Sequence, residues 1–245
     1  MSKLKSINPK EFKWFNYQSY SFSLGLTLEG SLYISGHSAS EFDPLDKKIV
    51  VRGGMEEQAN TALDKIECIL NAEGISLLEA THITENITTK GLDYYEDYEK
   101  VRNERLPGNI NKQVLVVDSL LRPDALIELE IRVEKDEEYL SDSIVTLPTL
   151  TPSLSVNRND VVAQTLDIYE QADKILQKLG FQLSDIVKTV DHITPGGLKE
   201  YKFTGKVRKE KLGPIYPGAT GILMTKVSKD DSLISVNITA AKGKK

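Results

Sequence analysis

The side chains that could carry chemistry are few in this chain of 245 residues. The three histidines, His37, His82 and His192, lie in unrelated segments, and Cys68 is the only cysteine, so no metal-ligand cluster is predicted. No glycine-rich phosphate loop occurs either. His37 follows a Ser-Gly pair, where an imidazole could donate or accept a proton near neutral pH. The alternative is a loop histidine that only makes hydrogen bonds.

Glu128 is the second candidate, because it lies on one face of a predicted strand. Residues 125–133 alternate apolar with mostly polar side chains, the period of two that is typical of a strand with one buried face. A carboxyl group on the polar face can act in general acid–base catalysis if that face borders a cavity. It could equally be a solvated carboxylate paired with Arg132 or a lysine, and the sequence leaves both interpretations open.

An internal repeat decides the domain organisation. QANTALDKIECILNAEGISL from Gln58 aligns with QTLDIYEQADKILQKLGFQL from Gln164, an offset of 106 residues that persists without a gap. It still holds where VRNERL from Val101 lies over VRKEKL from Val207. Because the period is long, each unit is a whole domain. We expect one domain at 1–135, a linker at 136–145 and a second domain at 146–245.

The sequence of each unit predicts the same order of helices and strands. A helix recurs at 55–70 and again from Asn159 or Asp160 to 176, with apolar residues at steps of three and four and a following glycine as C-cap. A strand, a second helix (capped at Thr194 in the second unit) and two closing strands follow. Residues 17–36 predict an opening hairpin with its turn at Glu29 and Gly30, which the second unit lacks or has trimmed.

Three stretches resemble the YjgF/RidA family. They are FSLGLTLEGSLYISGHSASEFDP, the helix end ILNAEG, and LLRPDALIELEIRV. The resemblance covers about residues 15–135, with a weaker copy at about 145–240. It implies an α+β fold of two chorismate-mutase-like domains in tandem, each a mostly antiparallel sheet with two helices on one face. It also implies hydrolysis of reactive enamines and imines, such as 2-aminoacrylate, to 2-keto acids and ammonia, in pockets between subunits of a trimer, without a metal or organic cofactor.

The resemblance carries functional residues onto particular positions. Glu128 matches the glutamate that positions or activates the attacking water, and His37 stands where the family has glutamine after Ser-Gly. Phe22 stands at the family's tyrosine position, although Tyr20, two residues away, could replace it. The implied catalytic residues are Glu128 and His37, and the implied substrate-binding residues are Phe22, Gly36, Tyr98 and Gln113.

The family's carboxylate-binding arginine has no match in this sequence. Ungapped alignment puts Gln113 there, or Lys112 after a shift of one residue, and neither has the planar charged fork that binds a carboxylate with two hydrogen bonds. We therefore expect an atypical substrate, such as one without a carboxylate. In the second unit Ala219 stands at the arginine position and Ser235 with Asn237 replaces two glutamates, so this unit is expected to be architectural.

Composition limits the partners. The net charge of −5 and the pI near 5.4 argue against binding to nucleic acid, and no apolar run is long enough to cross a membrane. The first residues do not form a secretory signal, so a cytoplasmic location is expected. We expect a homo-oligomer, either a trimer of tandem chains or a pseudo-hexameric ring. The leading hypothesis is a hydrolase, or deaminase, of a small C=N compound. The alternatives are a non-catalytic binding or regulatory protein and, third, an RNA-directed translation inhibitor or endoribonuclease.

Overall fold

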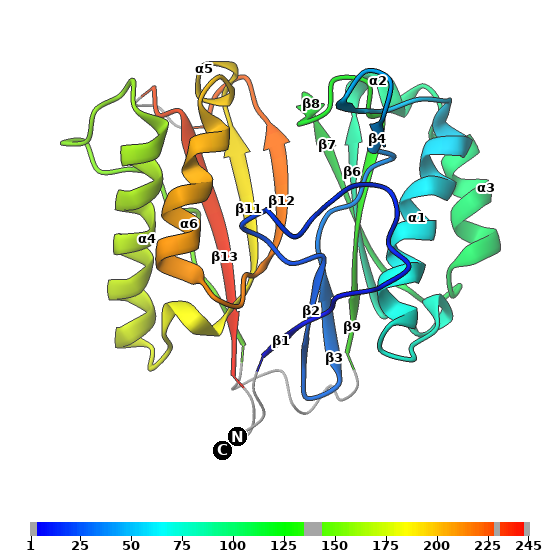
Figure 1. The fold of residues 1–245 in the computed structure, drawn as a ribbon, viewed down its shortest axis with the longest axis horizontal. Helices are drawn as coiled ribbons and strands as arrows, with labels where there is room; N and C mark the ends of the chain where they lie inside the picture. The colour runs from blue at the N-terminus through cyan, green and yellow to red at the C-terminus, as the bar shows by residue number, and fades with distance from the viewer. Residues whose placement is uncertain (1–3, 135–143, 228–230, 243–245) are drawn as a thin grey trace.

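The fold contains two large sheets, each covered by helices on its outer face (Figure 1). The structure is a computed structural model that describes residues 4–134, 144–227 and 231–242. The first sheet has the strand order β1-β2-β3-β9-β6-β7. Its strands are β1 (Lys5–Ser6), β2 (Gly25–Leu28), β3 (Ser31–Ile34), β9 (Ile127–Val133), β6 (His82–Thr88) and β7 (Asn111–Val117).

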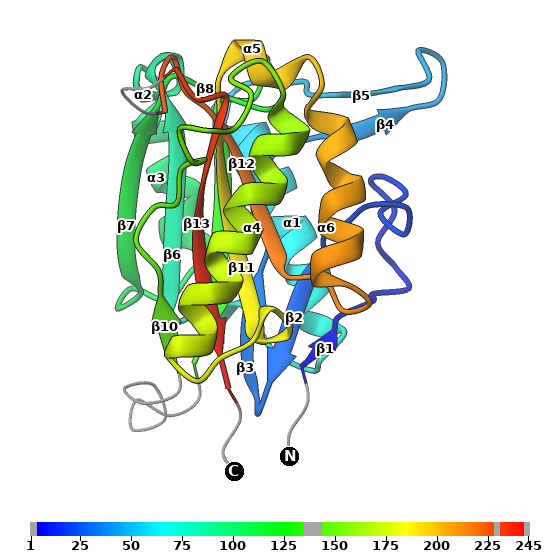
Figure 2. The ribbon, with the colours of Figure 1, turned by 90° about the vertical axis from the view of Figure 1, so that its left-hand side faces the viewer.

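The second sheet has the order β10-β13-β11-β12-β8. Its strands are β10 (Ile144–Thr146), β13 (Ile234–Ala241), β11 (Ile186–Ile193), β12 (Gly218–Leu223) and β8 (Ser119–Leu120). The pairs β6–β7 and β11–β12 are parallel, and the other pairs in both sheets are antiparallel. A separate hairpin, β4 (Glu41–Asp43) and β5 (Lys48–Val50), projects to one side in Figure 2. The expected α+β, mostly antiparallel architecture is therefore present in both halves.

The helices repeat in order. The first half has α1 (Met55–Asn71), the 3-10 helix η1 (Leu77–Glu79), α2 (Thr89–Leu92) and α3 (Tyr95–Arg105). The second half has α4 (Val161–Lys178), the 3-10 helices η3 (Leu183–Asp185) and η4 (Tyr201–Phe203), α5 (Pro195–Leu198) and α6 (Thr204–Leu212). The predicted second helix of each unit is thus broken: its first turn, capped by Thr88 or Thr194, is a separate short helix.

The core of each half lies between its sheet and its long helices. The apolar residues of α1 pack against Ile127, Leu129 and Ile131 of β9, and Ile234, Val236 and Ile238 of β13 contribute to the equivalent core. The alternation predicted for β9 is therefore present, and it turns Glu128 and Glu130 to the inner face. Ala125 departs from the predicted pattern, because it precedes the strand and belongs to a different apolar cluster.

The opening hairpin is shorter than predicted. Only β2 and β3 are strands, and Glu29 and Gly30 turn between them with φ of 51° and 88°. In the second half the single strand β10 stands in place of a hairpin, in line with the trimmed segment expected there. The predicted linker at 136–145 lies mostly outside the described residues, and β10 begins inside it at Ile144.

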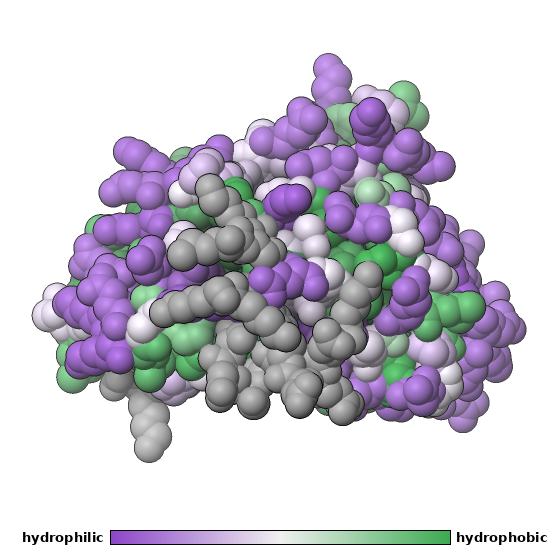
Figure 3. Space-filling model, turned by 90° about the horizontal axis from the view of Figure 1, so that it is seen from below, coloured by the Kyte–Doolittle hydropathy of each residue, from purple (hydrophilic) through white to green (hydrophobic). Residues whose placement is uncertain are grey.

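The inner faces of the two sheets turn toward each other and are joined by apolar and polar contacts. Two clusters combine residues of both halves: Leu26, Leu28, Tyr33, Val187 and Ala241, and Ala39, Val51, Val117, Leu120, Ala125 and Ile222. The backbone also bridges the halves, since the Gly36 N–H donates to the Ala219 carbonyl at 3.2 Å. Seen from below, hydrophilic residues dominate the outer flanks (Figure 3). No helix of the described residues is long and apolar enough to cross a membrane.

Candidate functional site

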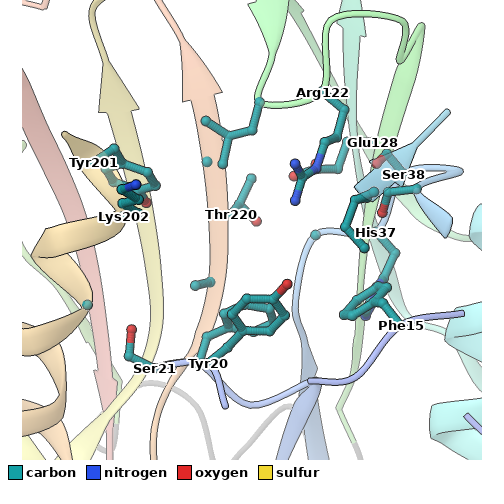
Figure 4. Close-up of a pocket in the computed structure, with 18 of the residues that line it drawn as sticks. Phe15, Tyr20, Ser21, His37, Ser38, Arg122, Glu128, Tyr201, Lys202 and Thr220 are labelled. Carbon is teal, nitrogen blue, oxygen red and sulfur yellow. The ribbon is translucent and has the colours of Figure 1, made fainter. Parts of the chain in front are cut away.

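A cavity of about 440 Å³ opens where the two halves meet. The first half contributes the segment from Phe15 to Phe22, the turn after β3, and residues of the loop before β9. The second half contributes α5 to α6 and β12 (Figure 4). The residues that line the cavity include Phe15, Tyr20, Phe22, Gly36, His37, Arg122, Glu128, Tyr201, Lys202, Arg208 and Thr220.

Glu128 is the chemically distinctive group of this cavity. Its side chain comes from the inner face of β9, the residue is 8% exposed, and Oε1 has no hydrogen-bond partner in the structure. Burial, reinforced by the nearby Glu130, raises the pKa of Glu128 to about 8, although Lys188, Lys65 and Arg122 oppose the shift. The group is therefore mostly a neutral carboxylic acid at pH 7.

Gly36 leaves the space in which Glu128 sits. A methyl group on its α-carbon would collide with Glu128 Oε1 and lie 2.6 Å from Thr220 Oγ1. Glu128 belongs to the first half and Thr220 to β12 of the second, so both halves close on this glycine. Only glycine fits here without displacing one of the two side chains.

His37 lines the cavity but does not titrate near neutral pH. It is 3% exposed, its backbone pairs with Leu129 of β9, and its Nε2 has no hydrogen-bond partner. Burial, with a contribution from Lys65, lowers its pKa to about 3. The imidazole is neutral at physiological pH, so the proton exchange near neutral pH that the sequence indicated is not supported.

The aromatic wall comes from the segment before β2. Phe22 lines the cavity, as does Tyr20, the alternative residue considered for its position. Their rings stack with centroids 5.2 Å apart and planes inclined by 13°. Phe15 lies next to Tyr20 in an edge-on contact at 6.1 Å. One side of the cavity is therefore lined by three aromatic residues, of which Tyr20 and Phe22 stack on each other.

Two residues implied by the resemblance lie elsewhere. Tyr98 is a fully buried residue of α3 whose hydroxyl donates to Glu85 Oε1 at 2.8 Å, so it is a core residue and does not line the cavity. Gln113 is exposed on β7, an edge strand of the first sheet. The strand that lines the cavity is β12 of the second sheet, and β7 does not reach it. Within one chain Gln113 therefore does not line the cavity that contains Glu128, and its role in substrate binding stays a prediction.

The strand register also corrects the repeat alignment. Gln113 pairs with Thr84 on β6, and Thr220 pairs with Val190 on β11. Since Thr84 and Val190 are equivalent in the repeat, Thr220, and not Ala219, is the counterpart of Gln113. The ungapped alignment slipped by one residue because residues 213–217, between the aligned Leu212 and β12, outnumber by one the residues 107–110 between Leu106 and β7.

Arg122 is a cavity residue that the sequence patterns did not indicate. It lies in the loop between β8 and β9, and Figure 4 shows its guanidinium extending toward Glu128. No hydrogen bond or ion pair joins it to another described side chain, whereas Arg208 on the opposite wall is paired with Asp191. The spacing of residues in LLRPDA does not indicate that the arginine side chain enters a cavity.

Lys65 binds the segment after β3 that lines the cavity, and the sequence analysis did not identify it. It is a buried lysine of α1, and its Nζ donates to the carbonyls of Ser38 and Ser40 at 2.6 and 2.5 Å. Burial lowers its pKa to about 7. A lysine among the apolar positions of an amphipathic helix was the available sequence signal, because such a group is buried only when it has partners.

A charged bridge joins the halves beside the site. Lys188 of β11 lies 2.8 Å from Glu130 Oε2 of β9 and donates to Thr220 Oγ1 at 3.0 Å. It also donates to the Ile34 carbonyl at 3.2 Å. Among the described residues there is no cluster of three or more His, Cys, Asp or Glu side chains that could hold a metal ion.

Comparisons with known proteins give structural matches only. No protein-family model matches the sequence, and no curated protein matches it. RidA from an Antarctic Psychrobacter is similar with 22% identity and a TM-score of 0.43, over 54% of this chain and 99% of that chain. Escherichia coli TdcF with bound serine is similar with 19% identity and a TM-score of 0.43, over 54% and 99%.

A third match is a Mycobacterium tuberculosis member of the YjgF/YER057c/UK114 family, with 16% identity and a TM-score of 0.42, over 54% of this chain and 100% of that chain. Each solved structure thus matches about half of the chain. The Psychrobacter protein is a RidA, and the Mycobacterium tuberculosis protein belongs to the YjgF/YER057c/UK114 family.

Proposed function

We propose that this chain is a hydrolase that adds water to the C=N bond of a small imine, or of the imine tautomer of an enamine, in the cavity between its halves. The observation that carries the proposal is Glu128: a buried carboxyl group with an unpartnered Oε1 in the wall of a ligand-sized cavity. Unpartnered buried polar atoms are uncommon in proteins, and at a cavity wall they indicate a group reserved for a ligand.

The raised pKa of Glu128 gives the order of proton transfers. The neutral acid first donates its proton to the imine nitrogen, which yields an iminium ion and a carboxylate. Water then adds to the carbon while the same carboxylate accepts one of its protons, which gives a carbinolamine. Collapse of the carbinolamine, with proton transfer to nitrogen, releases ammonia and a ketone. Glu128 ends as a neutral acid, ready for the next cycle.

Ammonia release from freshly generated imines tests this mechanism. Replacing Glu128→Gln keeps the shape of the side chain but removes the transferable proton, so the rate should fall by about 10²- to 10⁴-fold. The matched control is Glu96→Gln, an exposed glutamate on α3, which should leave the rate unchanged. A Glu128→Gln enzyme with the wild-type rate would remove the mechanism.

A second candidate function is ligand binding without turnover. It is favoured by the neutral state of both His37 and Glu128 at pH 7, because neither group supplies a ready-made base. A binding protein would be stabilised against heat by its ligand while releasing no product. The ammonia assay and a thermal denaturation series on the same compounds therefore separate the two functions.

We also propose that the chain is a tandem pair of YjgF/RidA-like domains that assembles with further copies. The repeated element order supports the tandem organisation. The edge strand β7 supports assembly, because Val114, Leu115 and Val116 are 39%, 37% and 56% exposed there. Light scattering should give a mass above the 27.3 kDa of one chain, and Val116→Lys should lower it. A monomeric wild type would contradict assembly.

A further inference from the structure

Lys65 is a buried amino group beside the cavity that the proposed mechanism does not use. It lies on the apolar face of α1 and is fully buried. Its Nζ donates to the carbonyls of Ser38 and Ser40 at 2.6 and 2.5 Å and lies 3.4 Å from Ser40 Oγ. An ammonium group has three hydrogens to donate, so three oxygen partners match its charged form. Because burying a charge is costly, a charged group at this position requires a reason beyond packing.

The hydrogen bonds of Lys65 fix the segment that borders Glu128. Four of the five residues 36–40 line the cavity. Within this segment, His37 exchanges both backbone hydrogen bonds with Leu129, the neighbour of Glu128, at 2.9 Å. Lys65 therefore holds from one side a stretch of backbone that pairs, on its other side, with the strand that carries Glu128.

The second half makes the same connection without a charge. The repeat offset of 106 residues puts Gln171 of α4 at the position of Lys65. Its Nε2 donates to the Thr151 carbonyl at 2.9 Å, so a side chain at this helix position again holds the segment that precedes the helix. Thr151 does not line the cavity, and Ser235 stands at the position of Glu128. A neutral amide is therefore sufficient for the connection, and the charge of Lys65 needs a second explanation.

A second pair of side chains supports this equivalence of positions. Gln58 of α1 and Gln164 of α4 each lie two helical turns before the residues compared. Gln58 Oε1 accepts from the Leu126 N–H and Gln164 Oε1 accepts from the Leu233 N–H, both at 2.8 Å. The two helices are thus in the same register against their sheets where Lys65 and Gln171 differ in charge.

The charge of Lys65 acts on Glu128, which must release and recover a proton in the proposed reaction. Burial and Glu130 of the same strand raise the pKa of Glu128, whereas Lys188 of β11, Lys65 of α1 and Arg122 of the loop before β9 lower it. Once Glu128 has given its proton to a substrate, the carboxylate that remains is stabilised by a nearby cation. A buried positive charge is therefore useful in the half that holds the carboxyl group.

Lys65 responds to Glu128 in turn. Burial lowers the pKa of Lys65 to about 7, Glu41 of β4 and Glu128 raise it, and Arg122 lowers it. The charged form of Lys65 is consequently favoured when Glu128 is a carboxylate, and the two groups titrate as a coupled pair. After burial, the charge of Lys65 is also the largest influence that lowers the pKa of His37, which keeps this imidazole neutral.

We propose that Lys65 is a positioning residue of the cavity: it holds residues 36–40 against α1, and its positive charge stabilises the Glu128 carboxylate that forms during the reaction. Lys65 does not line the cavity and does not touch the substrate. Its part in catalysis rests on the proposed function, but its action on the Glu128 carboxyl group does not require turnover.

Lys65→Gln removes the charge and keeps a hydrogen-bond donor, because Gln171 makes the equivalent connection with an amide. NMR of isotope-labelled glutamate carboxyl groups follows the titration of Glu128 in the full chain, and its signal is the one missing from Glu128→Gln. In Lys65→Gln the pKa of Glu128 should be higher than in the wild type. Lys100→Gln, which removes an exposed charge of α3, is the matched control and should leave it unchanged. An unchanged pKa in Lys65→Gln would overturn the proposal.

Lys65→Met is a second variant that keeps the test decisive if the amide disturbs folding. Replacing a buried charge by an apolar side chain of similar volume is often neutral or stabilising, so this variant should fold, and thermal denaturation checks both. It should raise the pKa of Glu128 in the same direction. Because the connection to Ser38 and Ser40 is lost as well, it should also raise KM. A folded Lys65→Met chain with the wild-type pKa of Glu128 would contradict the proposal.

Steady-state kinetics separates the electrostatic role of Lys65 from a structural one. Lys65→Gln should lower kcat for ammonia release by about three- to tenfold, with a smaller change in KM, because Glu128 becomes a weaker acid. In a Glu128→Gln background the same substitution should have almost no further effect, since no carboxyl proton remains to be controlled. Equal losses in the two backgrounds would mean that Lys65 only maintains the shape of the cavity, and would overturn its electrostatic role.

The two measurements also distinguish this proposal from the proposed function. A higher Glu128 pKa in Lys65→Gln, with no turnover of any imine by the wild type, would retain the action of Lys65 on the carboxyl group and remove the hydrolase. Turnover of imines with a Glu128 pKa that does not respond to Lys65 would retain the hydrolase and overturn the role of Lys65.

Discussion

The two halves carry the same buried cluster in different surroundings. Glu85 accepts hydrogen bonds from Tyr95 and Tyr98 and pairs with Arg102. At the repeat-related positions, Asp191 accepts from Tyr201 at 2.6 Å and pairs with Arg208. Tyr201 and Arg208 form part of the cavity wall, whereas Tyr95 and Arg102 do not. The same cluster therefore becomes part of a site only where the other half covers it.

On the inner faces of the sheets, only the first half has carboxyl groups at the equivalent strand positions. Glu128 and Glu130 on β9 correspond to Ser235 and Asn237 on β13, because Asn86 pairs with Glu128 as His192 pairs with Ser235. One half thus keeps the group able to transfer a proton, and the other supplies a wall for it. The candidate site is therefore formed at the junction between the halves and not by a single half.

The greatest loss of activity is expected when the polar group is removed at one of these two equivalent positions, Glu128, and not at the other, Ser235. Glu128→Gln should lower kcat/KM by about 10²- to 10⁴-fold, whereas Ser235→Ala at the equivalent position should change it less than about twofold. Steady-state ammonia release measures both. Comparable losses in the two variants would mean that the second half contributes chemistry of its own.

A smaller loss is expected where the halves close on Gly36. Gly36→Ala would push Glu128 or Thr220 aside, and overpacking of this kind lowers the free energy of unfolding by about 1–3 kcal/mol. The displaced side chain should also weaken ligand binding, by about tenfold for each 1.4 kcal/mol of interaction that is lost. Gly108→Ala is the control, because nothing lies within 4 Å of a methyl group there. Titration of both variants with the same ligand measures the effect. Wild-type affinity in Gly36→Ala would show that the Glu128 side is not where the ligand binds.

The smallest effect concerns stability and tests the bridge between the halves. Lys188→Met leaves Glu130 without its partner in a mostly buried position, so the free energy of unfolding should fall by about 1–3 kcal/mol. Lys100→Met, which breaks an exposed pair with Asp97 within α3, should leave it nearly unchanged. Chemical denaturation measures both variants. Equal stability in the two would mean that the bridge does not hold the halves together.

Local patterns were sufficient to predict most elements. The period of two in β9 put Glu128 on the polar face, and the period of 3.6 in α1 identified its buried residues. These patterns work because each element must turn its apolar side to one core. They could not show that α2, the turn capped by Thr88, is separate from α3, because the position of this turn is fixed by its contacts with β6 and with the loop before β9.

The site was less predictable because it depends on which half covers which edge. Gln113 and Thr220 occupy equivalent strands, yet only β12 meets Gly36. Which of the two strands packs against Gly36 is decided by tertiary contacts, and no local sequence pattern predicts it. The burial of His37 is also a tertiary effect, because its backbone pairs with Leu129 of β9 and its ring lies near Phe12. No local pattern predicts the direction of the Arg122 side chain in its loop. Phe22 and Gly36 were placed at the cavity because they lie in the segments that flank β2 and β3.

The pH dependence of kcat/KM tests the central claim most directly. If Glu128 must enter the reaction as a neutral acid, its raised pKa of about 8 means that the rate is constant below that value and falls about tenfold per pH unit above it. An imine that does not itself titrate in this range should be used, and the residual rate of Glu128→Gln should not show this decline. We expect a decline above about pH 8 in the wild type alone. A rate that instead rises through pH 8 would contradict it, because the carboxylate would then be the active form from the start.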